Sequence, residues 1–234
     1  MPDFIHRTCA TSMPQPLHTL DIETAPDPRA AIIVMHGLGA DATDFEPFAR
    51  EIDLAAVGPV RWVFPNAPSI PVTINGGYVM PAWYDIRPDR ADEDEAGLRR
   101  SQAAIEAVLA REQARGIPAR HTVLAGFSQG CAMALLTGLR HAERLAGIAG
   151  LSGYLPLAGR LAAERSAANA GALIFLAHGR HDDMVPPARA DATRDALRAL
   201  GYAVQWHDYP MGHSVCLEEV RDLRRWLLDV LAGE

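Results

Sequence analysis

Short runs of apolar residues recur along the chain, separated by longer segments whose apolar residues have the spacing of one helix face. Continuous apolar runs bounded by turn residues are typical of strands buried on both sides of a parallel sheet. Strands that alternate with helices predict an α/β protein with a mostly parallel sheet and helices on both faces. We expect strands at 17–23 (an edge strand), 32–35, 60–64, 122–126, 145–151, 172–177 and 202–208. We expect helices at 41–52, from about Glu95 to Gly116, directly after Ser128, at 187–200 and at 215–231.

The length of the chain limits the number of domains that it can form. Its 234 residues suffice for one α/β domain with a large core, and we expect a single domain over residues 17–234. Residues 1–16 have no apolar signal-peptide segment, so we expect a loose tail there. No apolar stretch approaches the ~20 residues of a membrane-spanning helix.

The net charge indicates which partners to expect, and the cysteine content indicates the cellular compartment. Lysine and arginine number 22 against 29 acidic residues, and this net charge of −7 argues against nucleic acid and against anionic membranes as main partners. Three cysteines, Cys9, Cys131 and Cys216, are too few for a disulfide framework and indicate a reducing compartment. We therefore expect a cytoplasmic protein without stable membrane insertion, whose partner is a small molecule. The sequence leaves the oligomeric state open, and a homodimer is compatible with it.

The most informative motif lies at residues 126–130, Gly-Phe-Ser-Gln-Gly, between a predicted strand and a predicted helix. This pattern in this context is typical of a nucleophile elbow, a turn so tight that glycine is needed on both sides of the serine. The serine then stands clear of the sheet at the positive end of the next helix. Ser128 is therefore the candidate nucleophile.

A serine nucleophile needs a base, and the base needs an acid that orients it. His213 follows the last predicted strand in a turn-rich loop, which is the position of the base in folds with a nucleophile elbow. Two carboxylates, Asp182 and Asp183, follow the strand at 172–177, and their spacing alone leaves either as the acid. The sequence thus predicts a triad of Ser128, His213 and one of these two aspartates.

Backbone amides must also stabilise the negative oxygen that forms when a serine attacks a carbonyl. One donor is expected from the residue after the nucleophile, Gln129. The other is expected from the glycine-containing loop His36-Gly37-Leu38-Gly39 after the strand that ends at Met35.

Three other interpretations carry less weight. The polar residues at 178–183 suggest metal ligands, but they match no known zinc spacing, and we expect neither a metal nor a cofactor. A Cys216–His213 pair is conceivable, although Cys216 has no elbow of its own. The acidic residues at 89–95 fit the start of a helix better than a calcium site.

The segment 66–85 is rich in proline, glycine and asparagine, yet many of its side chains are apolar. A loop of this length and composition either packs on itself or covers a substrate pocket, and the sequence leaves both open.

The chain resembles the carboxylesterase and acyl-protein thioesterase (lysophospholipase-like) family of small α/β-hydrolases over roughly residues 17–231. The resemblance rests on colinear motifs, namely His36-Gly37-Leu38-Gly39, Pro65-Asn66-Ala67-Pro68, residues 80–86, residues 126–130, residues 151–156, His178-Gly179-x-x-Asp182 and Gly212-His213. It implies an α/β-hydrolase fold without a large lid domain.

The resemblance also implies several residue roles. It places Asp182 in the triad and gives the oxyanion-hole amides to Leu38 and Gln129. In this family the segment before and around Trp83 borders the acyl groove, and residues 72–78 are closer to bacterial carboxylesterases. Cys131 stands where relatives often have glycine, which affects helix packing and not the mechanism.

Together these observations predict a serine carboxylesterase that acts on short- to medium-chain acyl esters. We expect Ile74, Met80 and Trp83 to line or cover the acyl site. An acyl-protein or lysophospholipid thioesterase-type hydrolase with the same triad is the alternative. A non-catalytic binding protein on the same fold is a third possibility, although such proteins usually lack a triad member.

Overall fold

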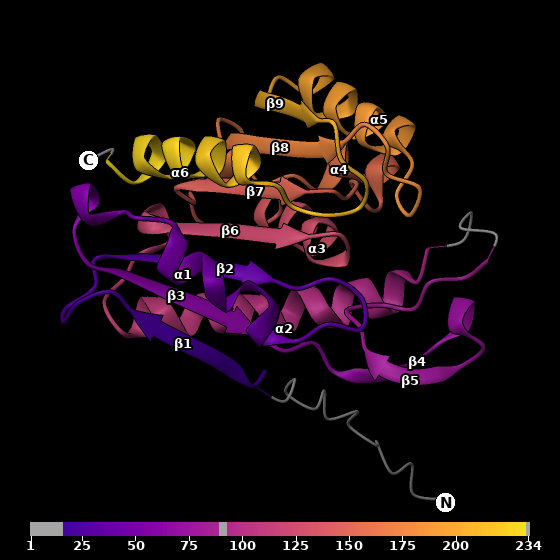
Figure 1. The fold of residues 1–234 in the computed structure, drawn as a ribbon, viewed down its shortest axis with the longest axis horizontal. Helices are drawn as coiled ribbons and strands as arrows, with labels where there is room; N and C mark the ends of the chain where they lie inside the picture. Colours follow the sequence, from indigo (N-terminus) through magenta and orange to yellow (C-terminus); the bar gives the residue numbers. More distant parts are fainter. Residues whose placement is uncertain (1–15, 89–92, 233–234) are drawn as a thin grey trace, which may run out of the picture.

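The computed structural model describes residues 16–88 and 93–232. Its centre is a seven-stranded sheet with the order β1-β3-β2-β6-β7-β8-β9 (Figure 1). Strand β1 is antiparallel to β3, and the other neighbours are parallel. The strands are β1 (Thr19–Glu23), β2 (Ala30–Met35), β3 (Val60–Pro65), β6 (Thr122–Phe127), β7 (Gly147–Leu151), β8 (Leu173–Gly179) and β9 (Ala203–Tyr209).

Helices cover both faces of this sheet, so the predicted α/β architecture with a mostly parallel sheet is confirmed (Figure 1). They are α1 (Glu46–Glu51), α2 (Glu95–Ala114), α3 (Gln129–Gly138), α4 (Ala158–Glu164), α5 (Pro187–Ala199) and α6 (Leu217–Leu231). Side chains of α2, α3, α4 and α5 pack in one apolar layer, and those of α6 and the segment before α1 pack in the other. Strands β2, β3 and β7 are buried at every position, which explains the continuous apolar runs of β2 and β7.

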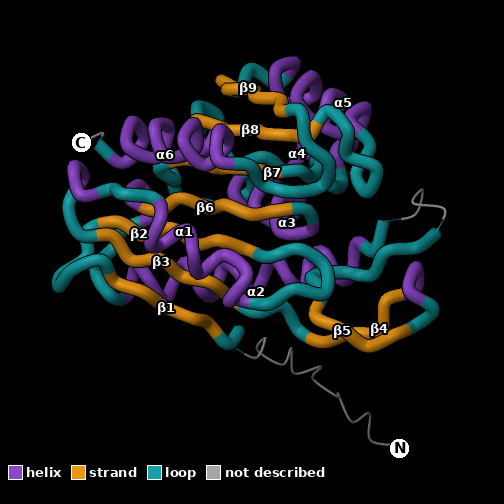
Figure 2. Tube along the Cα trace, in the orientation of Figure 1, coloured by secondary structure: helices purple, strands orange, loops and turns teal. Residues whose placement is uncertain are grey.

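The parallel strands end at one edge of the sheet, and the loops that follow them gather there (Figure 2). Ser128 follows β6, and Asp182 and His213 follow β8 and β9. This edge is where open α/β sheets bind their ligands. The order of the strands therefore brings together residues that are far apart in the sequence.

The segment at 66–85 differs from the predicted loop because it contains a two-stranded antiparallel hairpin. Strand β4 (Ser69–Val72) pairs with β5 (Tyr78–Pro81), and the connection turns through Gly76 and Gly77, which have φ of 67° and 81°. Glycine adopts such positive φ without the steric cost that other residues meet. The Asn75-Gly76 pair is a hairpin signal that could have identified this element.

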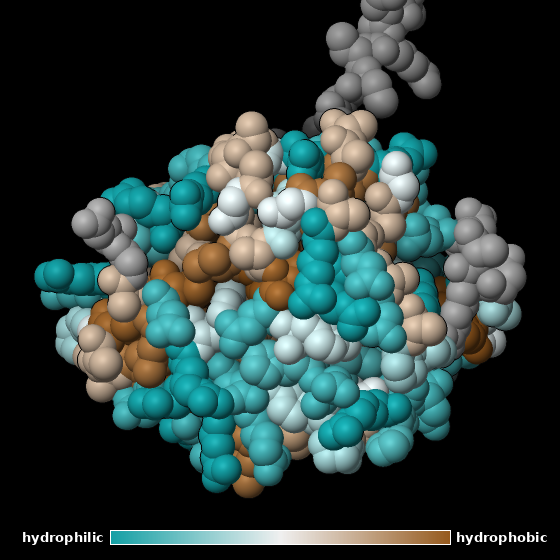
Figure 3. Space-filling model, turned by 90° about the horizontal axis from the view of Figure 1, so that it is seen from above, coloured by the Kyte–Doolittle hydropathy of each residue, from teal (hydrophilic) through white to brown (hydrophobic). Residues whose placement is uncertain are grey.

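Two further differences are local. Helix α4 was not expected from the sequence, and the predicted helix at 41–52 is a 3₁₀ turn, Ala42–Phe45, that leads into the short α1. The expected tail at 1–16, apart from its last residue, and part of the acidic segment at 89–95 lie outside the described residues. Within the described ranges, no helix is long and apolar enough to cross a bilayer. Seen from the β9 and α5 side, most of the surface is hydrophilic, with smaller apolar areas (Figure 3).

Candidate functional site

Ser128 sits in a strained turn between β6 and α3. Its φ of 56° and ψ of −115° are unusual for a residue with a side chain, and such strain is typical of functional sites. A Cβ atom at Gly126 would lie 2.2 Å from the backbone of Gly130, and one at Gly130 would lie 2.0 Å from the carbonyl oxygen of Met35. Both flanking positions therefore require glycine, as the motif predicts.

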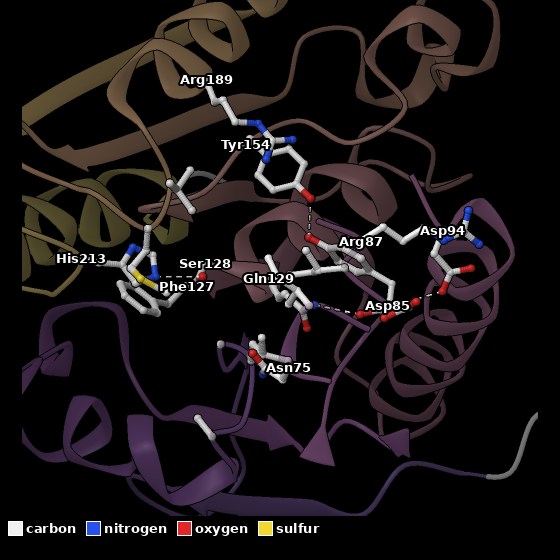
Figure 4. Close-up of a pocket in the computed structure, with 18 of the residues that line it drawn as sticks. Asn75, Asp85, Arg87, Asp94, Phe127, Ser128, Gln129, Tyr154, Arg189 and His213 are labelled. Carbon is white, nitrogen blue, oxygen red and sulfur yellow. Dashed lines mark hydrogen bonds between the residues drawn. The ribbon is translucent and has the colours of Figure 1, made fainter. Parts of the chain in front are cut away.

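His213 reaches this serine from the loop between β9 and α6. Its Nε2 lies 2.9 Å from Ser128 Oγ, which is hydrogen-bond distance (Figure 4). The imidazole also packs on the ring of Phe127, with 4.7 Å between the ring centroids. The serine and its predicted base are thus in direct contact.

Asp182, and not Asp183, contacts the other side of this imidazole. Asp182 Oδ2 lies 2.7 Å from His213 Nδ1. Its Oδ1 accepts hydrogen bonds from the backbone N–H groups of Met184, at 3.0 Å, and Val185, at 2.8 Å. These contacts hold the buried carboxylate in place, whereas Asp183 is exposed. The geometry therefore favours Asp182 for the acid, the residue that the family resemblance implies.

His178 is a further residue of this site that the sequence analysis did not single out. It is 2% exposed, and its Nε2–H donates to the carbonyl of Val185 over 2.8 Å. The same Nε2 lies 3.4 Å from Asp182 Oδ2. His178 thus lies beside the carboxylate oxygen that contacts His213, whereas the backbone donors bind the other oxygen. Its place in the His-Gly-x-x-Asp pattern, at the end of a buried strand, was the available signal.

The backbone amides of Leu38 and Gln129 are the candidates for the oxyanion hole. Leu38 and Gln129 both line the cavity that contains Ser128. No acceptor in the described part of the chain takes the amide hydrogen of either residue. Gln129 is also the first residue of α3, where backbone N–H groups are free and the helix dipole favours negative charge. This arrangement can stabilise a negative oxygen next to Ser128.

The imidazole of His36, at the start of the Leu38 loop, is buried and acts as an acceptor. Its Nε2 accepts from the backbone N–H of Ala67 over 3.0 Å. Burial lowers the pKa of His36 below its ordinary value, so the ring stays neutral and can keep this acceptor role. The loop that carries Leu38 is thereby tied to the segment after β3.

A cavity of about 300 Å³ opens beside Ser128. Its volume is at the lower end of the range for small-molecule pockets. Apolar side chains, including Ile74, Ile86, Phe127 and Val185, form part of its wall. Tyr84, Tyr154 and several charged residues line it as well, and the sequence analysis named none of these as site residues (Figure 4).

Of the three residues expected at the acyl site, the structure places only Ile74 in the cavity wall. Trp83 is 1% exposed, and its indole N–H donates to the carbonyl of His36 over 2.9 Å. Met80 lies beside Gly39, where a Cβ atom on that glycine would be 3.7 Å from its sulfur. Met80 and Trp83 are not among the residues of the cavity wall, and both pack against the loop that carries Leu38. Their expected place over the acyl site remains a prediction.

The structure gives little support to the two alternative sites, a metal site and a Cys216–His213 pair. Within residues 16–88 and 93–232, no three histidine, cysteine or acidic side chains are grouped as metal ligands. Burial raises the pKa of the Cys216 thiol above its ordinary value, which disfavours the reactive thiolate. His213 is meanwhile bonded to Ser128 and Asp182. The serine arrangement is thus the one that the contacts support.

A serine elbow on a mostly parallel, helix-covered sheet defines an α/β-hydrolase. Residues 19–231 match the family described as Phospholipase/Carboxylesterase, and the chain belongs to this family. The resemblance found in the sequence is thereby confirmed.

Curated relatives and solved structures agree with this assignment. Acyl-protein thioesterase 1 of Neurospora crassa is 41% identical over 86% of this chain and 87% of its own. Acyl-protein thioesterase 1 of Yarrowia lipolytica is 36% identical over 85% and 90%. Among solved structures, acyl-protein thioesterase 2 of Zea mays has a TM-score of 0.79 and 29% identity, covering 92% of this chain and 99% of its own. The chain is therefore a hydrolase of the esterase and thioesterase type.

Proposed function

We propose that this protein is a serine hydrolase that cleaves acyl thioesters and esters through an acyl-enzyme on Ser128. The observation that carries the proposal is the continuous contact from Ser128 Oγ through His213 to Asp182, at 2.9 Å and 2.7 Å. Because all three groups are present and in reach, the chain lacks the defect expected of a non-catalytic binding protein on this fold.

The first half of the reaction forms the acyl-enzyme. Asp182 accepts a hydrogen bond from His213 Nδ1–H, which leaves Nε2 with its lone pair toward Ser128. Nε2 takes the Oγ proton as the oxygen attacks the acyl carbon. The amides of Leu38 and Gln129 stabilise the resulting oxyanion. His213 then gives its proton to the departing sulfur or oxygen, and the acyl group stays on Ser128.

The second half returns the free enzyme. Water takes the place of the leaving group, and His213 Nε2 removes its proton as it attacks the acyl carbon. Collapse of the second tetrahedral intermediate releases the carboxylic acid and returns the proton to Ser128. The side chains and amides named here suffice for both halves without a cofactor.

The names of the relatives support the choice of substrate class. The sequence favoured a carboxylesterase for short- to medium-chain esters, but the curated relatives are named acyl-protein thioesterase 1 and support the thioesterase alternative better. We therefore place S-acyl thioesters first and simple esters second. The small cavity supports short to medium acyl groups over long ones. Three further points remain predictions, namely action on lysophospholipids, a cytoplasmic location and a homodimer.

A matched pair of peptides tests whether thioesters are preferred to esters as substrates. One peptide carries an acyl group on cysteine, and the other carries the same acyl group on serine at the same position. We expect the wild-type protein to hydrolyse the S-acyl peptide with the higher kcat/KM and Ser128→Ala to hydrolyse neither. Faster hydrolysis of the O-acyl peptide would show instead that the protein is a simple carboxylesterase. Equal activity of Ser128→Ala would contradict the triad.

A further inference from the structure

Arg189, in the first turn of α5, forms part of the wall of the Ser128 cavity. Its guanidinium carbon lies 3.5 Å from the ring centroid of Tyr154, so the planar group stacks on the aromatic ring (Figure 4). Thr193 links the backbones of the two segments, because its hydroxyl donates to the carbonyl of Arg189 and accepts from the N–H of Leu155, next to Tyr154. The guanidinium is thus held in place and half-buried.

Among the residues that the structure describes, no carboxylate pairs with this guanidinium. Within the described part of the chain, Arg189 makes no ion pair and its side chain makes no hydrogen bond, only the contact with Tyr154. By contrast, Arg194 on the same helix also stacks on an aromatic ring, that of Trp206, but is paired with Asp191 and Asp195. The N–H donors of Arg189 therefore have no acceptor among residues 16–88 and 93–232.

Three of the carboxylates that line the cavity are already used within the protein. Asp85 accepts from the N–H and hydroxyl of Thr73, and Asp94 accepts from the N–H groups of Gly97 and Asp85. Glu93 accepts from the N–H of Leu157. The remaining carboxylate of the lining, Asp44, is exposed and belongs to the segment after β2. These acids therefore hold loops together, and none of them pairs with Arg189.

A second donor lies beside the guanidinium. The hydroxyls of Tyr84 and Tyr154 are 2.9 Å apart, so one donates to the other. The hydroxyl that accepts keeps its own hydrogen free for a ligand. Burial raises the pKa of Tyr84 well above its ordinary value, which keeps the pair protonated. A cation and an O–H donor thus meet in one wall of the cavity.

We propose that Arg189 and the Tyr84–Tyr154 pair bind an anionic oxygen group of the substrate, a carboxylate or a phosphate, at a distance from the scissile carbonyl. This inference rests on the proposed function, because it assumes that the cavity holds the substrate of Ser128. The anion belongs either to the distal end of the acyl chain or to the leaving group. In both cases Arg189 determines specificity and takes no part in the chemical step.

Two matched substrate pairs distinguish these sources. The first pair is a hexanoyl thioester and its adipoyl analogue, which has a terminal carboxylate in place of the methyl group. The second pair is the hexanoyl thioester of mercaptopropionate and that of its amide. Each pair is assayed as kcat/KM with the wild-type protein, Arg189→Met, Arg189→Gln and Arg189→Lys. Arg194→Met serves as the control, because it removes a stacked arginine from the same helix outside the cavity.

We expect Arg189→Met and Arg189→Gln to lower kcat/KM for the anionic member of one pair by about tenfold, the scale of a lost hydrogen bond to a charged group. The neutral member should fall much less, so that the ratio of the two kcat/KM values changes, and Arg189→Lys should retain part of the preference. Loss confined to the adipoyl pair places the anion on the acyl chain. Loss confined to the mercaptopropionate pair places it on the leaving group.

The inference is overturned if both members of each pair fall equally, if neither preference changes, or if Arg194→Met has the same effect as Arg189→Met. Thermal unfolding of each variant shows whether the protein is still folded. Failure of the proposed function would look different, because the wild-type protein would then hydrolyse neither pair.

Discussion

The side-chain amide of Gln129 donates to the backbone carbonyl of Tyr84 over 2.9 Å. Its oxygen accepts from the N–H of the neighbouring Trp83 over 3.0 Å. Gln129 therefore has two separate tasks. Its side chain ties the nucleophile elbow to the segment after the β4–β5 hairpin, and its backbone amide is the one that we propose for the oxyanion hole.

Gln129→Ala should separate these tasks. The change leaves two buried backbone groups without partners, so we expect a loss of about 1–3 kcal/mol in the free energy of unfolding for each unsatisfied group. The backbone amide remains, so kcat should fall far less than in Ser128→Ala. Urea unfolding and steady-state kinetics measure the two effects. A variant as inactive as Ser128→Ala but of wild-type stability would contradict this division.

Asparagine substitutions at positions 182 and 183 test the choice of the acid. Asp182→Asn should lower kcat by about 10⁴-fold, the effect of the equivalent change in a serine protease, because the imidazole is then held in the wrong tautomer. Asp183→Asn should retain at least about a tenth of the activity, since an exposed surface change has little effect. Steady-state kinetics of both variants shows which aspartate is the acid. If Asp183→Asn is the inactive one, the assignment of the acid is wrong.

Ile74 and Trp83 should respond differently to truncation. Ile74→Ala removes part of the cavity wall, so it should shift the preferred acyl length while catalysis continues. Trp83→Ala removes a buried ring that holds the loop of Leu38, so it should cost about 3–5 kcal/mol of stability. The checks are kcat/KM across acyl lengths and urea unfolding. A stable Trp83→Ala protein with a shifted acyl optimum would reverse these roles.

Because Glu219 is buried in the first turn of α6, we predict that the stability of the folded protein depends on pH. Burial raises the pKa of this carboxyl from 4.5 to about 8. Between these pH values the folded chain keeps a proton that the unfolded chain has lost, so the stability falls as pH rises, by at most about 1.4 kcal/mol per unit. Below pH 4.5 both states are protonated, and the stability contribution is fully present.

Glu219→Gln should remove this dependence, because the amide has the same shape and no proton to lose. Urea unfolding of both proteins at several pH values between 5 and 8 gives the difference in stability. We expect this difference to move in favour of the variant as pH rises. Taking the difference cancels other titrating groups such as His36. A difference that stays constant with pH would show that Glu219 does not hold the proton.

Much of this arrangement can be predicted from the sequence, because the strongest signals are local. A strand such as β2 is buried at all six positions, so its apolar run is continuous. The glycines around Ser128 are required by contacts with their own neighbours in the chain and with Met35. Such constraints are visible in a short window of sequence, which is why the elbow and the parallel sheet were predicted.

The remaining features depend on contacts between distant segments. The spacing of Asp182 and Asp183 does not reveal which one meets His213, since that depends on how the loops after β8 and β9 pack. Trp83 looks like a pocket residue in sequence, but its indole faces the carbonyl of His36. The stacking of Arg189 on Tyr154 likewise joins two loops that no local pattern connects.

The central claim is that Ser128, activated by His213, forms a covalent acyl-enzyme. A fluorophosphonate probe tests it most directly, because such probes react with activated serines, and mass spectrometry of the intact protein and its peptides locates the adduct. We predict one adduct per chain on the peptide with Ser128, none in Ser128→Ala and a much slower reaction in His213→Ala. An adduct on another residue, or undiminished labelling of Ser128→Ala, would contradict the account.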